Sequence, residues 1–174
     1  IRLAKTFVGN DPFAVLYGDD IMKSDVPALK QLIDIYEKNN ANVIGCMEVD
    51  RNLVGRYGIV SFADENTNKI KTIIEKPKQE EAPSNIAGLG RYIVKPEIFD
   101  VLEKLSKGTG GEYQFTDAMK ELMKEQDFYA CIMDATYYDT GSKLGYLKAT
   151  IDYALEREDL KEPLKEYLKE RIEK

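Results

Sequence analysis

The 174-residue sequence contains no histidine, so the commonest general base and metal ligand of enzyme sites is missing. Its two cysteines, Cys46 and Cys131, each lie in an apolar run and do not form a Cys-x-x-Cys pair. A zinc site and a cysteine nucleophile would therefore both lack their usual partners. An enzyme made from this sequence must use carboxylates, lysine, or a substrate that is already ionised.

Long apolar runs are absent as well. No stretch approaches the roughly twenty apolar residues that a membrane span needs, and the start lacks the basic and apolar regions of a signal peptide. These absences predict a cytoplasmic protein. The net charge is -6, with lysine and arginine dispersed among acids, which argues against a nucleic-acid surface. We expect small-molecule or protein partners, and neither nucleic acid nor membrane.

Strand and helix patterns alternate along the chain and predict an α/β fold with a Rossmann-like, mixed but mainly parallel sheet flanked by helices. The apolar run 13–17 is typical of a strand buried on both faces. A helix pattern begins at Pro27, and a second strand pattern covers 42–49. Strand, helix and strand in this order predict a parallel, right-handed unit. Further strands are predicted over 56–62, 70–74, 86–94, 128–133 and 137–141.

The C-terminal part is predicted to be helical. One helix would follow residue 141 with an inner stripe, and residues 158–174 would form an amphipathic helix for packing or oligomerisation, separate from a partial domain over 1–157. The expected inner residues are Leu144, Leu147, Ile151 and Leu155 in the first helix, and Leu164, Leu168 and Ile172 in the second.

Acidic residues follow two of the predicted strands. Gly18-Asp19-Asp20 ends the first apolar run, and Asp139 stands between a strand and a helix. Carboxylates at such a place are suited to Mg²⁺, which needs only one or two from the protein. Asp19 and Asp139 would converge on one metal if their strands were near each other. A turn with an aspartate cap is an equally simple interpretation of the first pair.

The stretch Glu75-Lys76-Pro77 ends another strand, because Pro77 has no amide to continue a ladder. Ligands of open α/β sheets bind beyond strand ends, where the acid would hold a hydroxyl and the ammonium a phosphate. A surface ion pair before a turn explains an isolated Glu-Lys-Pro more simply. Gly58 and Gly90 could let a ligand approach the backbone, although a bulge at Gly58 and a packed neighbour at Gly90 are the simpler explanations.

Seven short segments, taken in order, resemble the bacterial UTP–glucose-1-phosphate uridylyltransferase family over essentially the whole chain. The segments are Leu16-Tyr17-Gly18-Asp19-Asp20, Tyr57-Gly58-Ile59-Val60, Ile74-Glu75-Lys76-Pro77, Pro83-Ser84-Asn85, Gly90-Arg91-Tyr92, residues 111–117 and residues 139–146.

The resemblance implies a role for each candidate residue. Asp19 and Asp139 match the family's Mg²⁺-binding aspartates and, with Lys76, its catalytic residues. Glu75 matches the acid that accepts sugar hydroxyls, Lys76 the cation on the sugar phosphate, and Gly58 and Gly90 the backbone that lines the glucose. The implied reaction joins UTP and glucose 1-phosphate into UDP-glucose and pyrophosphate. Its nucleophile is already an anion, which agrees with the lack of histidine.

One family feature is missing. Family members carry a Gly-x-Gly-Thr-Arg loop and a following lysine near the N-terminus, which cradle the UTP phosphates, whereas this chain begins at Ile1 with neither. We therefore expect a C-terminal portion that is inactive alone, exposes a sheet edge and forms a homo-oligomer. The alternatives are a thymidylyl- or adenylyltransferase of sugar 1-phosphates, or a non-catalytic sugar-phosphate-binding module.

Overall fold

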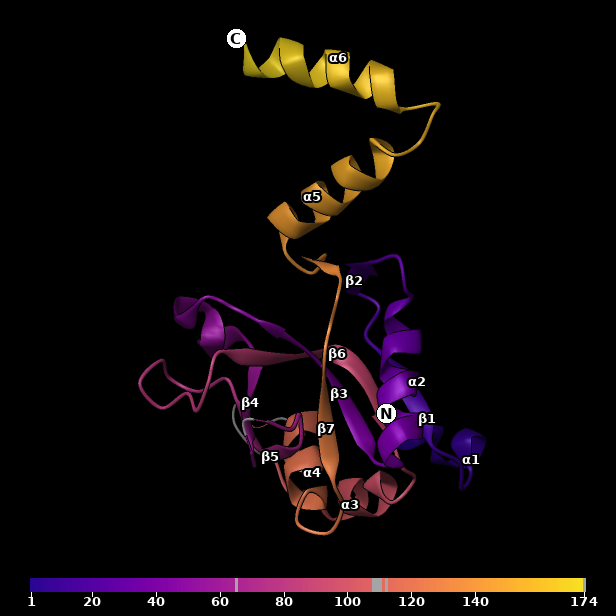
Figure 1. Ribbon diagram of the computed structural model, residues 1–174, viewed down its shortest axis with the longest axis vertical. Coiled ribbons are helices and arrows are strands. Elements are labelled where there is room, and N and C mark those ends of the chain that lie inside the picture. Colours follow the sequence, from indigo (N-terminus) through magenta and orange to yellow (C-terminus); the bar gives the residue numbers. More distant parts are fainter. Residues whose placement is uncertain (65, 108–110, 112, 174) are drawn as a thin grey trace. The chain divides into compact units, whose positions relative to one another are not determined.

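The computed structural model describes residues 1–64, 66–107, 111 and 113–173. The described chain divides into two compact units, drawn in Figure 1. The larger unit holds residues 1–17 and 24–134, and the smaller unit holds residues 18–23 and 135–174. The predicted boundary after residue 157 is a different division and stays a prediction. Residues 108–110 and 112 of the segment around the 111–117 motif lie outside the described residues.

The larger unit is built on a six-stranded sheet with the order β5-β4-β6-β3-β7, in which β1 also pairs with β6. Strand β6 is long enough to pair with β4 through residues 87–88, with β1 through residues 91–94 and with β3 along most of its length. The strands are β1 (Phe13–Leu16), β3 (Asn42–Glu48), β4 (Gly58–Phe62), β5 (Ile70–Glu75), β6 (Ile86–Val94) and β7 (Phe128–Ile132).

The prediction of a mixed α/β sheet is confirmed, but the prediction that it is mainly parallel is wrong. Among the described strand pairs of this sheet, β3 with β7 is parallel and the others are antiparallel. Strands β1 and β3 do run in the same direction, since both are antiparallel to β6. They are not neighbours, because β6 lies between them. The order of strands along the sequence could not show this insertion.

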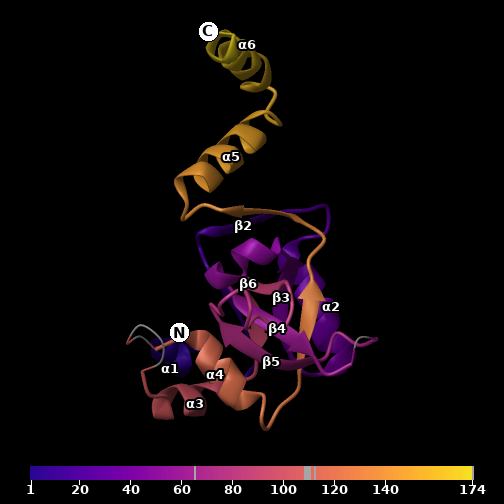
Figure 2. The same cartoon turned by 90° about the vertical axis from the view of Figure 1, so that its left-hand side faces the viewer.

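Helices cover both faces of the sheet, as Figure 2 shows. On one face, Leu32 of α2 (Ala28–Asn39) packs with Val43 and Cys131. On the other face, α3 (Ile98–Lys104) and α4 (Phe115–Leu122) pack with Ile44 and Ala130, which are the sequence neighbours of Val43 and Cys131 in the same two strands. Because successive strand side chains point to opposite faces, each internal strand contributes to both cores.

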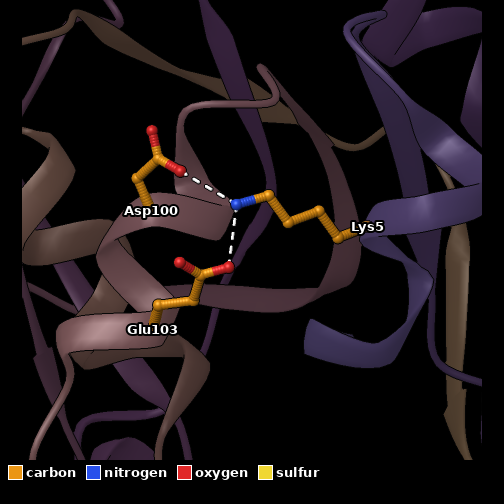
Figure 3. A network of polar contacts seen from close by, with 3 residues as sticks. All are labelled: Lys5, Asp100 and Glu103. Atoms are coloured by element: carbon orange, nitrogen blue, oxygen red, sulfur yellow. Dashed lines mark hydrogen bonds and ion pairs between the residues drawn. The ribbon is translucent and has the colours of Figure 1, made fainter.

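The N-terminal segment is held to α3 by one lysine (Figure 3). Lys5, the first residue of α1 (Lys5–Val8), donates hydrogen bonds to Glu103 Oε1 (2.8 Å) and Asp100 Oδ1 (3.1 Å). The hydrogen bonds that Lys5 donates, first to Glu103 and then to Asp100, raise the pKa of its ammonium. The Lys5 side chain is 43% exposed, so salt screens this contact, and buried apolar contacts such as those of Val8 fix the segment further.

Strand β1 is confirmed in position, but it is not buried on both faces as predicted. Phe13 and Val15 pack against the core, whereas Ala14 is exposed and Leu16 is 50% exposed. A continuous apolar run has no period that reveals which face is covered.

The smaller unit contains an antiparallel strand pair and two helices. Its elements are β2 (Asp20–Lys23), β8 (Thr136–Asp139), α5 (Lys143–Ala154) and α6 (Lys161–Ile172). Strand β2 was not predicted, since Gly18-Asp19-Asp20 was interpreted as a turn and only two apolar residues follow it. Its partner β8 supplies the backbone hydrogen bonds that such a short segment cannot supply alone.

The predicted inner stripe of α5 is wrong at Leu144 and Leu147, whereas Ile151 and Leu155 are half-buried. Leu144 and Leu147 are 64% and 55% exposed, whereas Ala149 is the buried residue of the helix. The face toward β8 instead carries Asp152, which accepts a hydrogen bond from the Tyr138 hydroxyl (2.7 Å). Leucine spacing alone therefore did not show that the first half of the predicted face is exposed.

Helix α6 has no buried residue, and Ile172 is 83% exposed rather than inward. Its predicted part in packing or oligomerisation stays a prediction. Across the part of the chain that the structure describes, no helix is long and apolar enough to cross a bilayer.

We expect the smaller unit to lose stability in alkali through Tyr138. The hydrogen bond to Asp152, followed by burial, raises the pKa of Tyr138 to about 12 from its ordinary value near 10. A raised pKa contributes stability that is fully present below about pH 10 and is lost as the pH rises toward about 12. Thermal melting at a series of pH values, monitored through the helical circular dichroism signal, should show this loss. Tyr138→Phe should flatten the pH dependence, and equal slopes in the two proteins would contradict the assignment.

Candidate functional site

The predicted site residues fall into two groups, one in each unit. The larger unit holds Gly58, Glu75, Lys76 and Gly90, and the smaller unit holds Asp19 and Asp139. Each group is described by itself.

Glu75 is the last residue of β5, as predicted from Pro77. Its side chain is only 13% exposed, and its two carboxylate oxygens have different neighbours. Oε2 accepts a hydrogen bond from Thr116 Oγ1 of α4 at 2.7 Å, and Oε1 lies 3.7 Å from Lys76 Nζ. The Glu75 carboxylate is therefore held in place at the end of the strand, whereas the Lys76 side chain remains 54% exposed.

Lys76 has a left-handed backbone conformation with φ of 44°. That conformation costs a non-glycine residue about 1 kcal/mol, and a residue before proline normally stays extended. The Lys76 amide still donates to the Tyr57 carbonyl at 2.9 Å, and Pro77 is buried behind it. The surroundings thus impose a strained turn directly after Glu75, which is where functional side chains are often placed.

Gly58 lies at the centre of this group, paired with Glu75 of β5 on one side and Gly88 of β6 on the other. A Cβ at Gly58 would lie 3.1 Å from Ile73 Cδ1, 3.3 Å from Glu75 Oε2 and 3.3 Å from Thr116 Cγ2. The irregular register of β4 and β5 falls between Ser61 and Phe62, so the interpretation of Gly58 as a bulge is wrong. A side chain at this position would therefore require Ile73, Glu75 or Thr116 to shift by a few tenths of an ångström.

Gly90 lies two residues beyond Gly88 on β6, next to the end of β1. Its carbonyl accepts hydrogen bonds from the Tyr17 amide and from Arg91 Nη1, both at 2.8 Å. Gly88, rather than Gly90, adjoins Gly58. The proposed sugar-lining role of Gly90 stays a prediction.

Asp19 and Asp139 come together in the smaller unit. The ladder of β2 and β8 pairs Asp20 with Asp139, and the Thr140 amide and hydroxyl both donate to the Asp19 carbonyl at 2.8 Å. Asp19 Oδ2 and Asp139 Oδ1 each lie 3.2 Å from the position that a Cβ on Gly141 would occupy. Two carboxylate oxygens therefore surround one small space that a glycine leaves open.

The two residues of the Asp19-Asp20 pair have different partners. Asp20 Oδ1 accepts a hydrogen bond of 2.5 Å from the Tyr137 hydroxyl across the ladder. Asp20 thus supports the strand pair, and Asp19 supplies the carboxylate that faces Asp139.

The turn after Asp139 is fixed by the residues around it. Ser142 caps α5 by accepting a hydrogen bond from the Gly145 amide (3.0 Å), and its hydroxyl donates to the Asp139 carbonyl (2.9 Å). A Cβ at Gly145 would lie 1.9 Å from that carbonyl oxygen, so only glycine fits. This cap sets where the strand ends and where the Asp139 side chain is presented.

The donor set of the two aspartates fits a hard divalent cation. Within the described residues there is no group of three or more histidine, cysteine, aspartate or glutamate side chains arranged for a metal. A closed zinc or calcium cage is therefore not formed by these residues, whereas Mg²⁺ uses one or two carboxylates and completes its shell with water and substrate phosphates.

The cysteines do not take part in either group. Both are buried, and burial raises the pKa of the Cys46 thiol far above its ordinary range and that of Cys131 to about 11. Neither thiol ionises near neutral pH, so neither is a nucleophile there.

Two cavities in the described part of the chain can be compared with the predicted site residues. One of about 630 Å³ lies between α3 and α4 and is lined by charges of both signs, including Glu97, Lys104 and Lys120, but by none of the predicted site residues. A smaller one of about 380 Å³ is lined by residues 140–143, Tyr146 and Leu147, directly after Asp139. The larger of these two cavities therefore does not coincide with the predicted site residues, which are identified by their chemistry and not by the size of a cavity.

The sequence prediction did not include Thr116, although this residue binds Glu75 directly. The 111–117 motif contained it, but no role was assigned to that motif. Contact between α4 and the end of β5 depends on tertiary packing, which spacing along the chain does not reveal.

Comparison with known proteins gives a consistent result. Residues 1–156 match the family model described as nucleotidyl transferase. A UTP–glucose-1-phosphate uridylyltransferase of Staphylococcus epidermidis is 46% identical over 172 residues, which are 98% of this chain and 60% of that protein. These similarities confirm the resemblance predicted from the sequence.

Solved structures agree with the sequence comparison. UDP-glucose pyrophosphorylase from Acinetobacter baumannii matches with a TM-score of 0.84 at 36% identity, covering 97% of this chain and 60% of that one. A UDP-glucose pyrophosphorylase complexed with UDP-glucose matches with a TM-score of 0.83 at 36% identity, covering 90% of this chain and 61% of that one. This chain thus spans about 60% of the length of these relatives.

We expect Asp19→Asn to weaken divalent-cation binding by about tenfold, because one of two facing carboxylates loses its charge. Asp20→Asn is the matched control, since its side chain binds Tyr137, and it should change the affinity by less than about twofold. Titration with Mn²⁺ followed by electron paramagnetic resonance measures both affinities. Equal losses in the two variants, or an unchanged affinity in Asp19→Asn, would contradict the assignment.

Proposed function

Because the chain belongs to the nucleotidyl transferase family, we propose that it supplies the sugar-phosphate-binding residues and the metal-binding residues for transfer of a uridylyl group from UTP to glucose 1-phosphate. The products are UDP-glucose and pyrophosphate. The proposal covers the residues present in this chain, which spans about 60% of the length of its relatives.

The observation that supports this function best is the pair Glu75 and Lys76 at the end of β5. A carboxylate accepts hydroxyl hydrogens, and an ammonium on a flexible stem attracts a phosphate. Here the acid is fixed by Thr116 and the lysine is exposed after a strained turn. A sugar 1-phosphate presents hydroxyls and a phosphate at its two ends, and so it matches both groups. Gly58 and Gly90 would bring backbone close to the sugar ring.

The reaction needs no general base from the protein. An anionic phosphate oxygen of glucose 1-phosphate attacks the α-phosphorus of UTP. A new phosphorus–oxygen bond forms as the bond to the bridging oxygen breaks, and pyrophosphate leaves with that electron pair. Lys76 holds the sugar phosphate and offsets its charge, which allows two anions to approach. Glu75 holds the sugar so that the phosphate points to its target.

Asp19 and Asp139 are the residues proposed to hold a divalent cation, Mg²⁺ being the best fit to two carboxylates. When bound, such a cation neutralises phosphate charge and favours the release of pyrophosphate. The protein's own contribution is to keep the two carboxylates facing each other through the β2 and β8 ladder and the Ser142 cap.

The choice of uridylyl over thymidylyl or adenylyl transfer rests on similarity. The staphylococcal relative is a UTP–glucose-1-phosphate uridylyltransferase, and one matching structure is complexed with UDP-glucose. Neither Glu75 nor Lys76 touches a base in the proposed scheme, so these residues suit any nucleotidyl transfer to a sugar 1-phosphate.

We expect Lys76→Gln to weaken glucose 1-phosphate binding by about tenfold or more, because a charge-assisted contact to the phosphate is lost while a polar side chain only one atom shorter is kept. Lys78→Gln is the matched control, since Lys78 lies two residues further on with a side chain that is 73% exposed. Its affinity should stay within about twofold of the parent value. Calorimetric titration with glucose 1-phosphate measures both. Similar losses in the two variants would reject Lys76 as the phosphate ligand.

A further inference from the structure

The two oxygens of the Glu75 carboxylate are not equivalent. Oε2 receives the Thr116 hydroxyl hydrogen at 2.7 Å, and Oε1 lies toward the exposed Lys76 ammonium at 3.7 Å. A threonine hydroxyl has one hydrogen to donate, so the Thr116 donor is used on this carboxylate. The contact joins residues 41 positions apart in the chain.

The position of Thr116 is set by the core beneath α4. Phe115 and Met119 of the same helix belong to the main hydrophobic cluster, and Met119 is completely buried. The N-cap of α4 is Gln114, so the Thr116 side chain is not the cap of its helix. A close-packed core allows little movement, and the hydroxyl therefore has a fixed place relative to β5.

Gly58 completes the arrangement. The position of a Gly58 Cβ is 3.3 Å from Glu75 Oε2 and 3.3 Å from Thr116 Cγ2, so the strand backbone lies against both partners. The carboxylate is confined between the β4 backbone and the Thr116 hydroxyl. A carboxylate held in one orientation loses less conformational entropy when a ligand binds than one that rotates freely.

We propose that Thr116 is a positioning residue that fixes the Glu75 carboxylate for the hydroxyls of a hexose 1-phosphate. This inference rests on the proposed function and adds to it. Thr116 does not touch the substrate; it holds Oε2, so that Oε1 is directed to the sugar. It therefore contributes to selection of a sugar phosphate over phosphate alone, because phosphate uses Lys76 and not Glu75.

The test compares two probes by calorimetry on the full 174-residue chain: glucose 1-phosphate and inorganic phosphate. Thr116→Val keeps the shape and removes the hydroxyl. We expect it to weaken glucose 1-phosphate binding by about tenfold and to leave phosphate binding within about twofold. Thr116→Ser restores a hydroxyl and should recover most of the glucose 1-phosphate affinity. A purely structural role for Thr116 would weaken both probes together.

A double-mutant cycle makes the mechanism explicit. In a Glu75→Gln background, the further change Thr116→Val should reduce glucose 1-phosphate affinity much less than it does in the parent chain, because both substitutions act through the same contact. Should Thr116→Val not fold, as judged by circular dichroism, Thr116→Ala removes the same hydroxyl with a smaller side chain. It should likewise reduce the preference for glucose 1-phosphate over phosphate, whereas Thr116→Ser should keep that preference.

The outcomes separate the two proposals. If the parent chain binds glucose 1-phosphate but Thr116→Val binds it equally well, or if the Val and Ser variants are equally weak, the positioning role is wrong and the proposed function stands. If Thr116→Ala replaces Thr116→Val and leaves the preference unchanged, the positioning role is equally refuted. If the parent chain binds no glucose 1-phosphate, the proposed function fails and the role of Thr116 fails with it.

Discussion

The pairing of Gly58 with Glu75 on one side and Gly88 on the other is the constraint on which the sugar-phosphate group depends. It places a residue without a side chain beside the carboxylate at the C-terminal end of β5, with a second glycine on the other side of it. Because a Cβ at Gly58 would meet both Glu75 and Thr116, the pairing also fixes how closely α4 approaches β5. A shift of one residue in this register would turn Glu75 to the other face of the sheet and separate it from Thr116.

Apolar packing supplies the rigidity that the polar contacts need. The same cluster that buries Met119 and Phe99 carries Thr116 above it, and the strained turn at Lys76 is held between the Tyr57 carbonyl and buried Pro77. A hydrogen bond at the end of a strand contributes modestly by itself. When its donor is attached to a packed core, the hydrogen bond keeps the carboxylate in one orientation. Ligand binding then does not have to order that carboxylate.

Local signals in the sequence predicted much of this arrangement. Pro77 indicated where β5 ends, and acidic residues after strands indicated Asp19 and Asp139. The predictions that failed all depended on contacts between distant segments. The insertion of β6 between β1 and β3 made the sheet largely antiparallel, β2 formed only against β8, and Leu144 and Leu147 of α5 are exposed. Thr116 was missed for the same reason, since its partner is far away in the sequence.

The central claim is that Glu75 and Lys76 hold the two ends of a sugar 1-phosphate. The most direct measurement is a diffraction experiment on crystals of the chain soaked with glucose 1-phosphate. The account predicts difference density for a hexose with a hydroxyl within hydrogen-bonding distance of Glu75 Oε1 and for its phosphate at Lys76 Nζ, while Thr116 still binds Oε2. Density for the sugar phosphate at another place, with Glu75 and Lys76 making no contact to it, would contradict the account.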